Sequence, residues 1–281
     1  MRILVTGSQG QLGRELMRVL AADHKVDGTD LPDLDIRDGD AVRRLIEKTR
    51  PEAVIHAAAL TDTRRCEEDP DLAHQVNGAG TRNVALACRE ADSALLYVST
   101  NEVFDGRKGT PYRESDETNP INAYGRSKLA GEEEVRSLRT KRWIVRTAWV
   151  YGEGSGNFPA KILAAASQQS ELAVVTDEIA TPTWARDLAA AIAALVEQPI
   201  YDIYHFTNGG ECSRYEWARE VLRLAGREDI TLKPTTMAEY QPFPAKPPYS
   251  VLRNEAGAKL GISLRPWREA LGAHFAPLRE G

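Results

Sequence analysis

The N-terminal stretch constrains the fold most, because it joins a short apolar run to a glycine-rich turn and a helical pattern. Residues 2–6 (RILVT) form a run typical of strands that are buried on both faces. Gly7, Gly10 and Gly13 follow, and leucines then recur at helical spacing over residues 12–20. A strand, a glycine turn and a helix in this order leave free backbone N–H groups where a pyrophosphate can bind. We therefore predict a dinucleotide site here, with a purely structural turn as the alternative.

Asp30 is the next informative position, because it ends the second predicted strand, residues 24–29. A carboxylate at this point can accept a hydrogen bond from the 2′-hydroxyl of an adenosine ribose, and it repels a 2′-phosphate. Asp30 therefore favours NADH over NADPH. Arg37 is close enough in sequence to contact an anion instead, and an aspartate at a strand end can also be an ordinary turn residue.

Strand and helix patterns alternate along the chain, which predicts an α/β fold with a doubly wound parallel sheet of the Rossmann type. In such sheets ligands bind at the carboxyl ends of the strands. Further strands are predicted at 34–36, 53–59, 95–100, 143–151 and 203–207; the predicted helices begin at a cap on Asp40, span 71–91, 158–167, 183–197 and 215–225, and include 124–134.

The domain organisation follows from the length of 281 residues, which is long for one domain and short for two. We predict an NAD(P)-binding Rossmann core at 1–152, which 158–225 partly rejoin, and a smaller C-terminal substrate-binding lobe made of 153–157 and 226–281. Prolines and aromatic residues gather between 234 and 249. This stretch is poor in sheet signals and suits a lid over a nucleotide base and sugar, whereas an ordinary surface loop is the alternative.

Tyr124 and Lys128 are the candidate catalytic pair, because they are four residues apart and therefore share one face of the predicted helix. A phenol titrates near pH ~10, and a neighbouring cation favours its anion, so Lys128 is predicted to lower the pKa of Tyr124. Such a pair can exchange protons at neutral pH. Tyr-x-x-x-Lys alone is a weak pattern, and a solvated pair on a helix surface is the alternative.

Several motifs occur together in one order along the chain. They are the glycine turn, the alanines at 57–59, Val98-Ser99-Thr100, Val103-Phe104-Asp105-Gly106, Pro111-Tyr112, Pro120 with Tyr124-Gly125, Ser127-Lys128 and Gly131-Glu132, Arg146-Thr147 with Trp149 and Tyr151-Gly152, Ala180-Thr181-Pro182-Thr183, Asp187-Leu188-Ala189, and Ser250-Val251-Leu252. In this order they resemble the extended short-chain dehydrogenase/reductases and, more narrowly, the dTDP-4-dehydrorhamnose reductases. The resemblance runs from the first residue to about residue 270 and strengthens the reading of Tyr124 and Lys128.

The resemblance implies reduction, by NADH or NADPH, of the C4 ketone of dTDP-4-dehydro-6-deoxy-L-mannose to dTDP-L-rhamnose. It implies that Tyr124 protonates the developing alkoxide, that Lys128 holds the nicotinamide ribose and that Thr100 binds the reacting oxygen. Trp149 is expected to pack on the sugar, with a core aromatic as the alternative. The predicted cofactor-binding residues are Gly7, Gly10, Gln11, Leu12, Gly13, Asp30, Asp35, Ile36, Ala57, Ala58, Ala59, Val98, Tyr124 and Lys128. The predicted substrate-binding residues are Thr100, Asn101, Glu102, Trp149 and Lys246.

Some positions depart from the pattern of the reductases. Asn101 and Glu102 stand where they usually carry Asp-Tyr, whereas the related dehydratases carry Asp-Glu as the acid and base for water elimination. Glu102 therefore resembles the dehydratase base, but Asn101 cannot donate a proton as an acid. Lys246 stands where the reductases often carry an arginine, so it would meet a diphosphate as a point charge without a bidentate fork. Arg64 and Arg65 stand where an aspartate is common.

Composition limits the partners. The net charge is −5 and neither sign forms long blocks, so nucleic acid and membrane are not predicted partners. Three cysteines without a Cys-x-x-Cys motif, and no histidine cluster, indicate a reducing compartment and no metal. Without a leader-like or membrane-spanning stretch the prediction is cytoplasmic. A monomer or a homodimer is expected; Glu15 matches a position where some family members hold magnesium at a dimer contact, although a solvated carboxylate is the preferred reading.

Two alternative functions stay open. One is another nucleotide-sugar epimerase, dehydratase or ketoreductase of the same superfamily, which would recycle a tightly held NAD. The other is a non-catalytic NAD(P)-binding regulatory subunit that resembles the one of methionine adenosyltransferase. His56 and His205 fall in predicted strands, and we expect them to be hydrogen-bonded core residues rather than catalysts.

Overall fold

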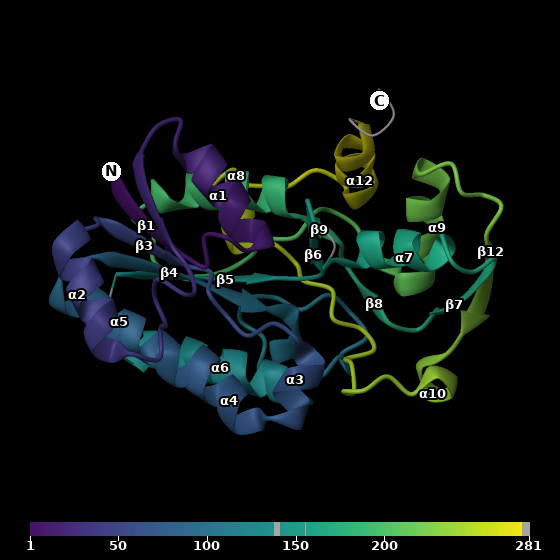
Figure 1. The fold of residues 1–281 in the computed structure, drawn as a ribbon, viewed down its shortest axis with the longest axis horizontal. Helices are drawn as coiled ribbons and strands as arrows, with labels where there is room; N and C mark the ends of the chain where they lie inside the picture. The colour runs from purple at the N-terminus through teal and green to yellow at the C-terminus, as the bar shows by residue number, and fades with distance from the viewer. Residues whose placement is uncertain (138–140, 155, 277–281) are drawn as a thin grey trace.

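The centre of the fold is a six-stranded sheet in the computed structural model, which describes residues 1–137, 141–154 and 156–276 (Figure 1). The strand order is β10-β5-β4-β3-β1-β2, and every neighbouring pair is parallel. Because the order reverses direction between β1 and β3, a crevice opens there at the carboxyl ends of the strands. The strands are β1 (Arg2–Thr6), β2 (Lys25–Thr29), β3 (Ala53–His56), β4 (Ala94–Thr100), β5 (Arg142–Thr147) and β10 (Ile203–His205).

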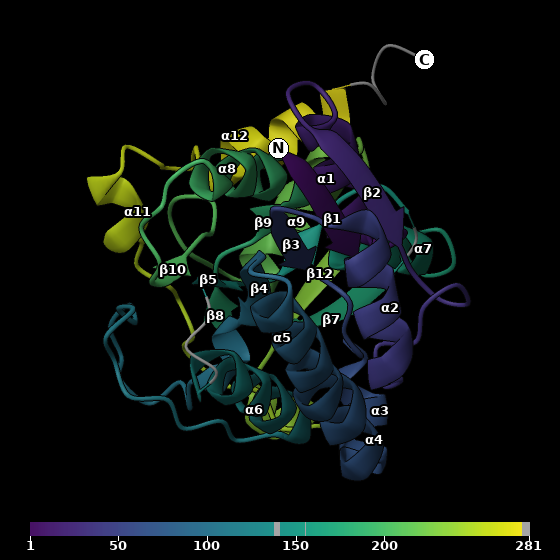
Figure 2. The ribbon, with the colours of Figure 1, turned by 90° about the vertical axis from the view of Figure 1, so that its left-hand side faces the viewer.

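Helices cover both faces of this sheet, as the two ribbon views show (Figures 1 and 2). On one face lie α1 (Gln11–Leu20) and α8 (Ala185–Val196), and on the other lie α2 (Gly39–Thr49), α5 (Thr81–Glu90) and α6 (Ala123–Ser137). Two separate apolar clusters therefore form, one on each face of the sheet. The predicted Rossmann-type doubly wound fold is confirmed.

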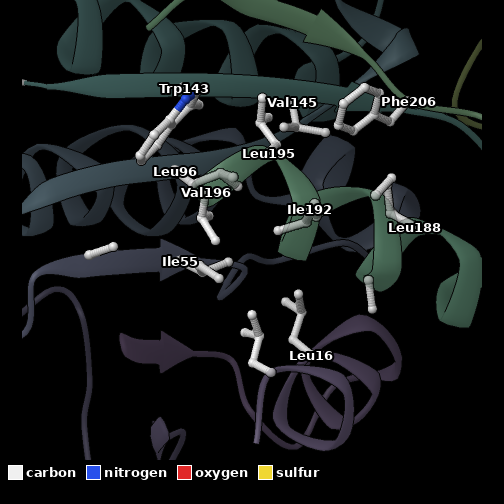
Figure 3. Packing of buried hydrophobic residues seen from close by; sticks show 14 of the residues in the cluster. Leu16, Ile55, Leu96, Trp143, Val145, Leu188, Ile192, Leu195, Val196 and Phe206 are labelled. Atoms are coloured by element: carbon white, nitrogen blue, oxygen red, sulfur yellow. The ribbon is translucent and has the colours of Figure 1, made fainter. Parts of the chain in front are cut away.

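The helix α8 returns the chain from the second half of the sequence to the sheet. Its side chains Leu188, Ile192 and Leu195 are fully buried and face the strand residues Ile55 and Val145 (Figure 3). Burying each such side chain contributes about 1.5–3 kcal/mol relative to leaving it exposed. The strand predicted at 203–207 also rejoins the sheet, as β10 beside β5.

A second group of elements lies beyond the ends of β4 and β5, at the right of Figure 1. It contains α7 (Phe158–Ala166), α9 (Arg214–Leu224), α12 (Trp267–Phe275), β7 (Glu171–Val175) and β12 (Thr231–Thr235), which share an apolar cluster of their own. The stretch that the sequence marks as poor in sheet signals does contribute β12, which pairs in parallel with β7. A proline within β12 is tolerated because the pair has only two strands, so each has a free edge. The limits of the substrate-binding lobe remain a prediction.

The helix predicted at 71–91 is continuous in direction but not in hydrogen bonding. It consists of α4 (Pro70–His74), a π-helical segment (Gln75–Gly80) and α5. Among the described residues no helix has both the length and the apolar character needed to cross a bilayer. The remaining short elements are α3 (Thr63–Glu68), the 3₁₀ turn Asn101–Val103, β6 (Val150–Tyr151), β8 (Ile179–Ala180), β9 (Thr183–Trp184), β11 (Cys212–Ser213), α10 (Met237–Tyr240) and α11 (Ala256–Lys259).

Two predictions around residue 36 are wrong. Residues 34–36 form turns rather than a strand, because the backbone and guanidinium N–H groups of Arg37 donate to the Asp35 carboxylate, each at 3.0 Å. The cap of α2 is Asp38 and not Asp40: its Oδ1 accepts a hydrogen bond of 2.9 Å from the backbone N–H three residues later. The sequence places an acidic residue at both positions, and only the backbone geometry selects between them.

Two predicted strands are also too long. The strand predicted at 53–59 ends at His56, so the three alanines form the loop that leaves the sheet. The strand predicted at 143–151 ends at Thr147, because Trp149 has a left-handed backbone with a φ of 46°. The chain resumes as β6, which pairs with β9 in a separate two-stranded sheet.

Candidate active site

A cavity of about 750 Å³ lies at the carboxyl ends of the central strands, where the strand order reverses. It extends from the glycine turn after β1, past the ends of β3 and β4, to Trp149 and Asn157. All but one of the predicted cofactor- and substrate-binding residues line it, and the exception is Lys246. The fold therefore brings these positions together, while the role of each stays a prediction.

The glycine turn leaves room for a ligand only because three side chains are missing. Gly7 has a φ of 73°, and a Cβ added there would lie 2.6 Å from the backbone nitrogen of Ala58. A Cβ added to Gly13 would lie 2.0 Å from the carbonyl oxygen of Gly7. The N–H of Gly10 donates to that carbonyl at 3.1 Å, and α1 begins directly after it. This geometry fits a dinucleotide, whose pyrophosphate approaches the backbone at a helix N-terminus.

We predict that Gly13→Ala lowers the free energy of unfolding by about 1–3 kcal/mol and removes NADH binding, because the added methyl overlaps a backbone carbonyl that cannot move aside. Urea unfolding and fluorescence titration with NADH measure the two effects. Gly272→Ala is the matched control, since a Cβ at that position in α12 meets nothing within 4 Å. Wild-type NADH affinity in Gly13→Ala would contradict the role of the turn.

Asp30 lies at the mouth of the same cavity, and its carboxylate is held in place by the backbone. Oδ2 accepts a hydrogen bond of 2.9 Å from the N–H of Gln9, and Oδ1 accepts one of 2.9 Å from the N–H of Leu31. Arg37, the alternative anion contact, is engaged by Asp35 at 2.9 Å, and its guanidinium lowers the pKa of that carboxyl. The arrangement leaves Asp30 as the group positioned to meet an adenosine ribose.

We predict that Asp30→Ala weakens NADH binding about tenfold and NADPH binding much less, because only NADH offers a 2′-hydroxyl to the carboxylate. Fluorescence titration of both cofactors measures the difference. Asp33→Ala is the matched control, since Asp33 is an exposed aspartate of the same loop. Equal losses for the two cofactors would refute the ribose role and indicate that Asp30 only holds the loop.

Tyr124 and Lys128 lie one turn apart near the start of α6, and both line the cavity. The side chain of Thr100, at the end of β4, hydrogen-bonds the Tyr124 phenol. The Lys128 ammonium is buried and lies 4.2 Å from the ring centre of Tyr97. The three predicted catalytic side chains thus meet at one end of the cavity, where β4 and α6 come together.

The predicted lowering of the pKa of Tyr124 is wrong for this structure. Burial raises the pKa of the phenol above its usual range, and the Glu102 carboxylate raises it further, while the hydrogen bond with Thr100 opposes both. Burial also lowers the pKa of Lys128 to about 7, which the charge of Glu132 opposes. Sequence spacing carries no information about burial, and here burial outweighs the attraction between the pair. The phenol is therefore protonated at neutral pH and is suited to donate a proton.

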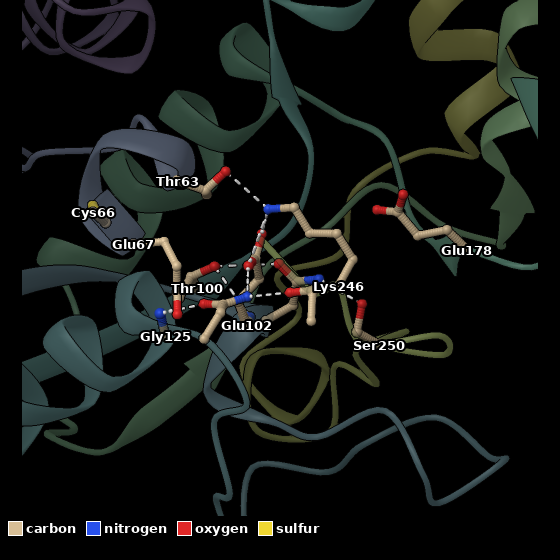
Figure 4. A network of polar contacts seen from close by, with 12 residues as sticks. Thr63, Cys66, Glu67, Thr100, Glu102, Gly125, Glu178, Lys246 and Ser250 are labelled. Carbon is tan, nitrogen blue, oxygen red and sulfur yellow. Dashed lines mark hydrogen bonds and ion pairs between the residues drawn. The ribbon is translucent and has the colours of Figure 1, made fainter. Parts of the chain in front are cut away.

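Lys246 is the predicted site residue that the structure places elsewhere. Its ammonium lies 3.1 Å from Oε1 of Glu102 and 3.0 Å from Oγ1 of Thr63, at the edge of the cavity (Figure 4). Glu102 also accepts a hydrogen bond of 2.6 Å from Nδ2 of Asn122. The carboxylate that departs from the reductase pattern is thus paired with the lysine that replaces the usual arginine. Their pairing ties the C-terminal segment to the core.

Asn101 and Trp149 each have a partner in the second group of elements. Nδ2 of Asn101 donates to Oγ of Ser250 at 2.7 Å. The Trp149 ring stacks on Trp217 with ring centres 5.5 Å apart, and the Arg214 guanidinium lies 3.6 Å from its centre. Trp149 therefore belongs both to the cavity wall and to the second apolar cluster, which combines the two readings of its sequence position.

Two contributors escape sequence reasoning. Asn77, in the π-helical segment, binds the backbone N–H and carbonyl of Leu60 at 2.8 and 3.0 Å and Oγ of Ser127 at 2.9 Å, so it fastens the loop after β3 to α6. Nothing local distinguishes this asparagine from a solvated one. Glu132 and Arg146 form a buried ion pair beneath the cavity. Their signal is visible, since each is a charge within an otherwise apolar or catalytic face.

His56 and His205 are buried and hydrogen-bonded, as predicted. His56 contacts the hydroxyls of Thr6 and Thr81 at 2.7 and 3.1 Å. Nδ1 of His205 lies 3.1 Å from the carbonyl oxygen of Tyr112. Burial lowers the pKa of each to about 3, so both are neutral.

Glu15 pairs with Arg18 one turn later, at 2.6 Å. Within the described ranges no group of three or more His, Cys, Asp and Glu side chains is arranged to hold a metal ion.

The comparison with known proteins identifies the family. Residues 1–280 match the family described as the RmlD substrate binding domain. The chain belongs to the RmlD family. It is 40% identical over 285 residues to a dTDP-4-dehydrorhamnose reductase of Streptomyces griseus, covering 99% of this chain and 94% of that one. It is also 40% identical over 271 residues to the spore coat polysaccharide biosynthesis protein SpsK of Bacillus subtilis, covering 96% and 95%.

A solved structure extends the likeness of this RmlD-family chain to three dimensions. The crystal structure of a dTDP-4-dehydrorhamnose reductase from Bacillus anthracis in complex with NADP superimposes with a TM-score of 0.94 at 34% identity. The match covers 98% of this chain and 99% of that one. The resemblance to the dTDP-4-dehydrorhamnose reductases that the ordered motifs indicate is therefore confirmed.

Proposed function

We propose that this RmlD-family chain is an NAD(P)H-dependent reductase of a nucleotide-linked 4-keto sugar, namely dTDP-4-dehydro-6-deoxy-L-mannose, and that its product is dTDP-L-rhamnose. The grouping of Thr100, Tyr124 and Lys128 at one end of a cavity that begins at a dinucleotide turn carries the proposal. The reductases among its relatives support the choice of substrate.

The glycine turn, Asp30, the alanine loop after β3, Val98 and Lys128 would hold the cofactor. When bound, NADH or NADPH supplies the hydride. The small side chains of the loop give the cofactor a surface without bulk. Thr100 and Tyr124, at the other end of the cavity, would then meet the reacting oxygen of the sugar.

The chain's own chemistry is the delivery of a proton. The Tyr124 phenol donates its proton to the oxygen of the former ketone, and the raised pKa of the phenol keeps it protonated until that moment. Thr100 orients the phenol and offers its own hydroxyl to the same oxygen. Donation leaves a phenolate in a buried place, and the Lys128 ammonium one turn away offsets that charge. Lys128 can do so only while it is itself protonated.

The sugar and nucleotide would lie between the cavity and the C-terminal segment. Trp149 offers a flat apolar face for a sugar ring, and Asn101 lies buried at the cavity wall. Glu102 is paired with Lys246, and Asn101 cannot act as an acid, so the acid–base pair for water elimination is incomplete. This observation favours the reductase over a dehydratase.

Copurification of tightly bound NAD without net oxidation of added cofactor would point to an epimerase instead. Binding of NADH without turnover of any 4-keto sugar would point to the regulatory-subunit alternative. A dTDP-sugar reductase should release its oxidised cofactor after each turnover, so one equivalent of NADH or NADPH is consumed per sugar reduced. Chromatography of the reaction mixture with a dTDP-rhamnose standard tests the product directly.

A further inference from the structure

Three ionisable side chains form a line down one face of α6. Tyr124, Lys128 and Glu132 stand at successive steps of four residues, so they lie one above another. The first two line the cavity, whereas Glu132 is fully buried behind them. A carboxylate in that position is costly unless it is paired and hydrogen-bonded, so its contacts indicate what it does.

The contacts of Glu132 are saturated by two neighbouring strands. Arg146, on β5, donates from Nε to Oε1 at 2.9 Å and from a terminal nitrogen to Oε2 at 2.7 Å. Ser99, on β4, donates its hydroxyl to Oε1 at 2.6 Å. The two-pronged contact is the one a guanidinium makes with a carboxylate. Glu132 is therefore fixed as an anion at a set distance below Lys128.

A buried ion pair of this kind is not required for stability, since apolar side chains of the same volume pack as well or better in many proteins. Arg146 is only 2% exposed, and its guanidinium also lies over the Phe104 ring at 5.1 Å and 3.5 Å from His205. The pair thus occupies space that a well-packed apolar cluster could fill. Its position directly behind the catalytic lysine gives the charge a use.

The other groups around Lys128 do not supply a negative charge at neutral pH. Burial raises the pKa of Tyr97 on β4 well above its usual value and that of Cys66 on α3 to about 11, so both are neutral. His56 on β3 is neutral as well, because burial lowers its pKa to about 3. On its own helix, Tyr124 is a protonated phenol. Glu132 is the carboxylate whose charge acts on Lys128, with Arg146 behind it.

We propose that Glu132, held by Arg146 and Ser99, is a positioning residue whose buried carboxylate keeps the Lys128 ammonium charged at the cavity. The proposal deepens the proposed function, on which it rests, because a charged Lys128 is what offsets the Tyr124 phenolate and holds the nicotinamide ribose there. Glu132 itself does not line the cavity; it acts through Lys128.

The sign of the expected pH effect follows from the two opposing contributions. Burial lowers the pKa of Lys128 to about 7, and the charge of Glu132 works against that lowering. Removing the charge lowers the pKa of Lys128 further, so the ammonium is lost at a lower pH. Activity and NADH affinity then persist on the acidic side and fall earlier on the alkaline side.

The test is Glu132→Gln, which keeps the shape of the side chain and removes its charge. NADH affinity, by fluorescence titration without substrate, and kcat/KM are measured across the neutral range. The alkaline limb of both profiles should move down by about one pH unit, which is about a tenfold loss at the alkaline end. Glu133→Gln is the matched control, since Glu133 is the exposed neighbour on the same helix, and its limb should stay at the wild-type position.

A second variant separates charge from folding. Glu132→Gln leaves Arg146 unpaired, so the double variant Glu132→Gln with Arg146→Met restores a neutral interior and should show the same early alkaline limb. Losses that are equal at every pH, with the wild-type midpoint in both variants, would overturn the proposal and leave a purely structural pair. Failure of the proposed function would instead appear as a wild-type protein that reduces no 4-keto sugar, and the NADH profile would still decide the role of Glu132.

Discussion

Tyr124→Phe is expected to lower kcat by about two to four orders of magnitude, which is the usual contribution of a positioned general acid. The substitution keeps the ring that lines the cavity and removes only the hydroxyl that Thr100 binds. NADH affinity should stay within a few-fold of wild type, because the glycine turn and Asp30 are untouched. Steady-state assays with the keto sugar and fluorescence titration with NADH measure the two quantities separately.

Tyr201→Phe is the matched control for this experiment. Tyr201 is 40% exposed and packs against Trp143, away from the cavity. Its kcat should equal that of wild type. A Tyr124→Phe enzyme that turns over at a rate close to wild type would show that another group delivers the proton and would refute the mechanism.

Arg146→Met is expected to lower the free energy of unfolding by about 3–5 kcal/mol, because it strands the Glu132 carboxylate in the interior without its partner. The loss should be recovered in large part by adding Glu132→Gln, since both charges are then gone. Urea unfolding of wild type, both single variants and the double variant forms a cycle that isolates the pairing energy.

Arg43→Met provides the exposed counterpart of that experiment. Arg43 pairs with Asp40 on α2, where the side chains are 50% and 68% exposed. Such a pair contributes about 0–1 kcal/mol, so its loss should barely change the unfolding midpoint. A double variant of the buried pair that is no more stable than Arg146→Met alone would contradict the assignment of the large loss to an uncompensated charge.

The fold was predictable from the sequence wherever the signal is local. The apolar run 2–6, the run 95–100 and the helical pattern 183–197 all carry their own periodicity, and the structure has β1, β4 and α8 there. The break at Trp149 was not predictable, because its left-handed backbone serves the pairing of β6 with β9, a partner more than thirty residues away. The turn at 34–36 was missed for a related reason, since a strand also needs a neighbour to pair with.

The candidate site was predictable to a similar depth. The glycine turn, Asp30 and the pair Tyr124 and Lys128 each have a recognisable spacing, and the fold places all of them on one cavity. The burial of that pair has no such signal, and it reverses the predicted direction of the Tyr124 pKa. Glu102 and Lys246 are 144 residues apart, so their ion pair depends on how the C-terminal segment packs on the core.

The most direct test of the central claim follows NADH and NADPH oxidation through the absorbance of the reduced nicotinamide, with dTDP-4-dehydro-6-deoxy-L-mannose generated in the cuvette. We predict stoichiometric oxidation with dTDP-L-rhamnose as the product, and NADH preferred if Asp30 binds the ribose as proposed. Binding of both cofactors without any oxidation would contradict the proposed reaction.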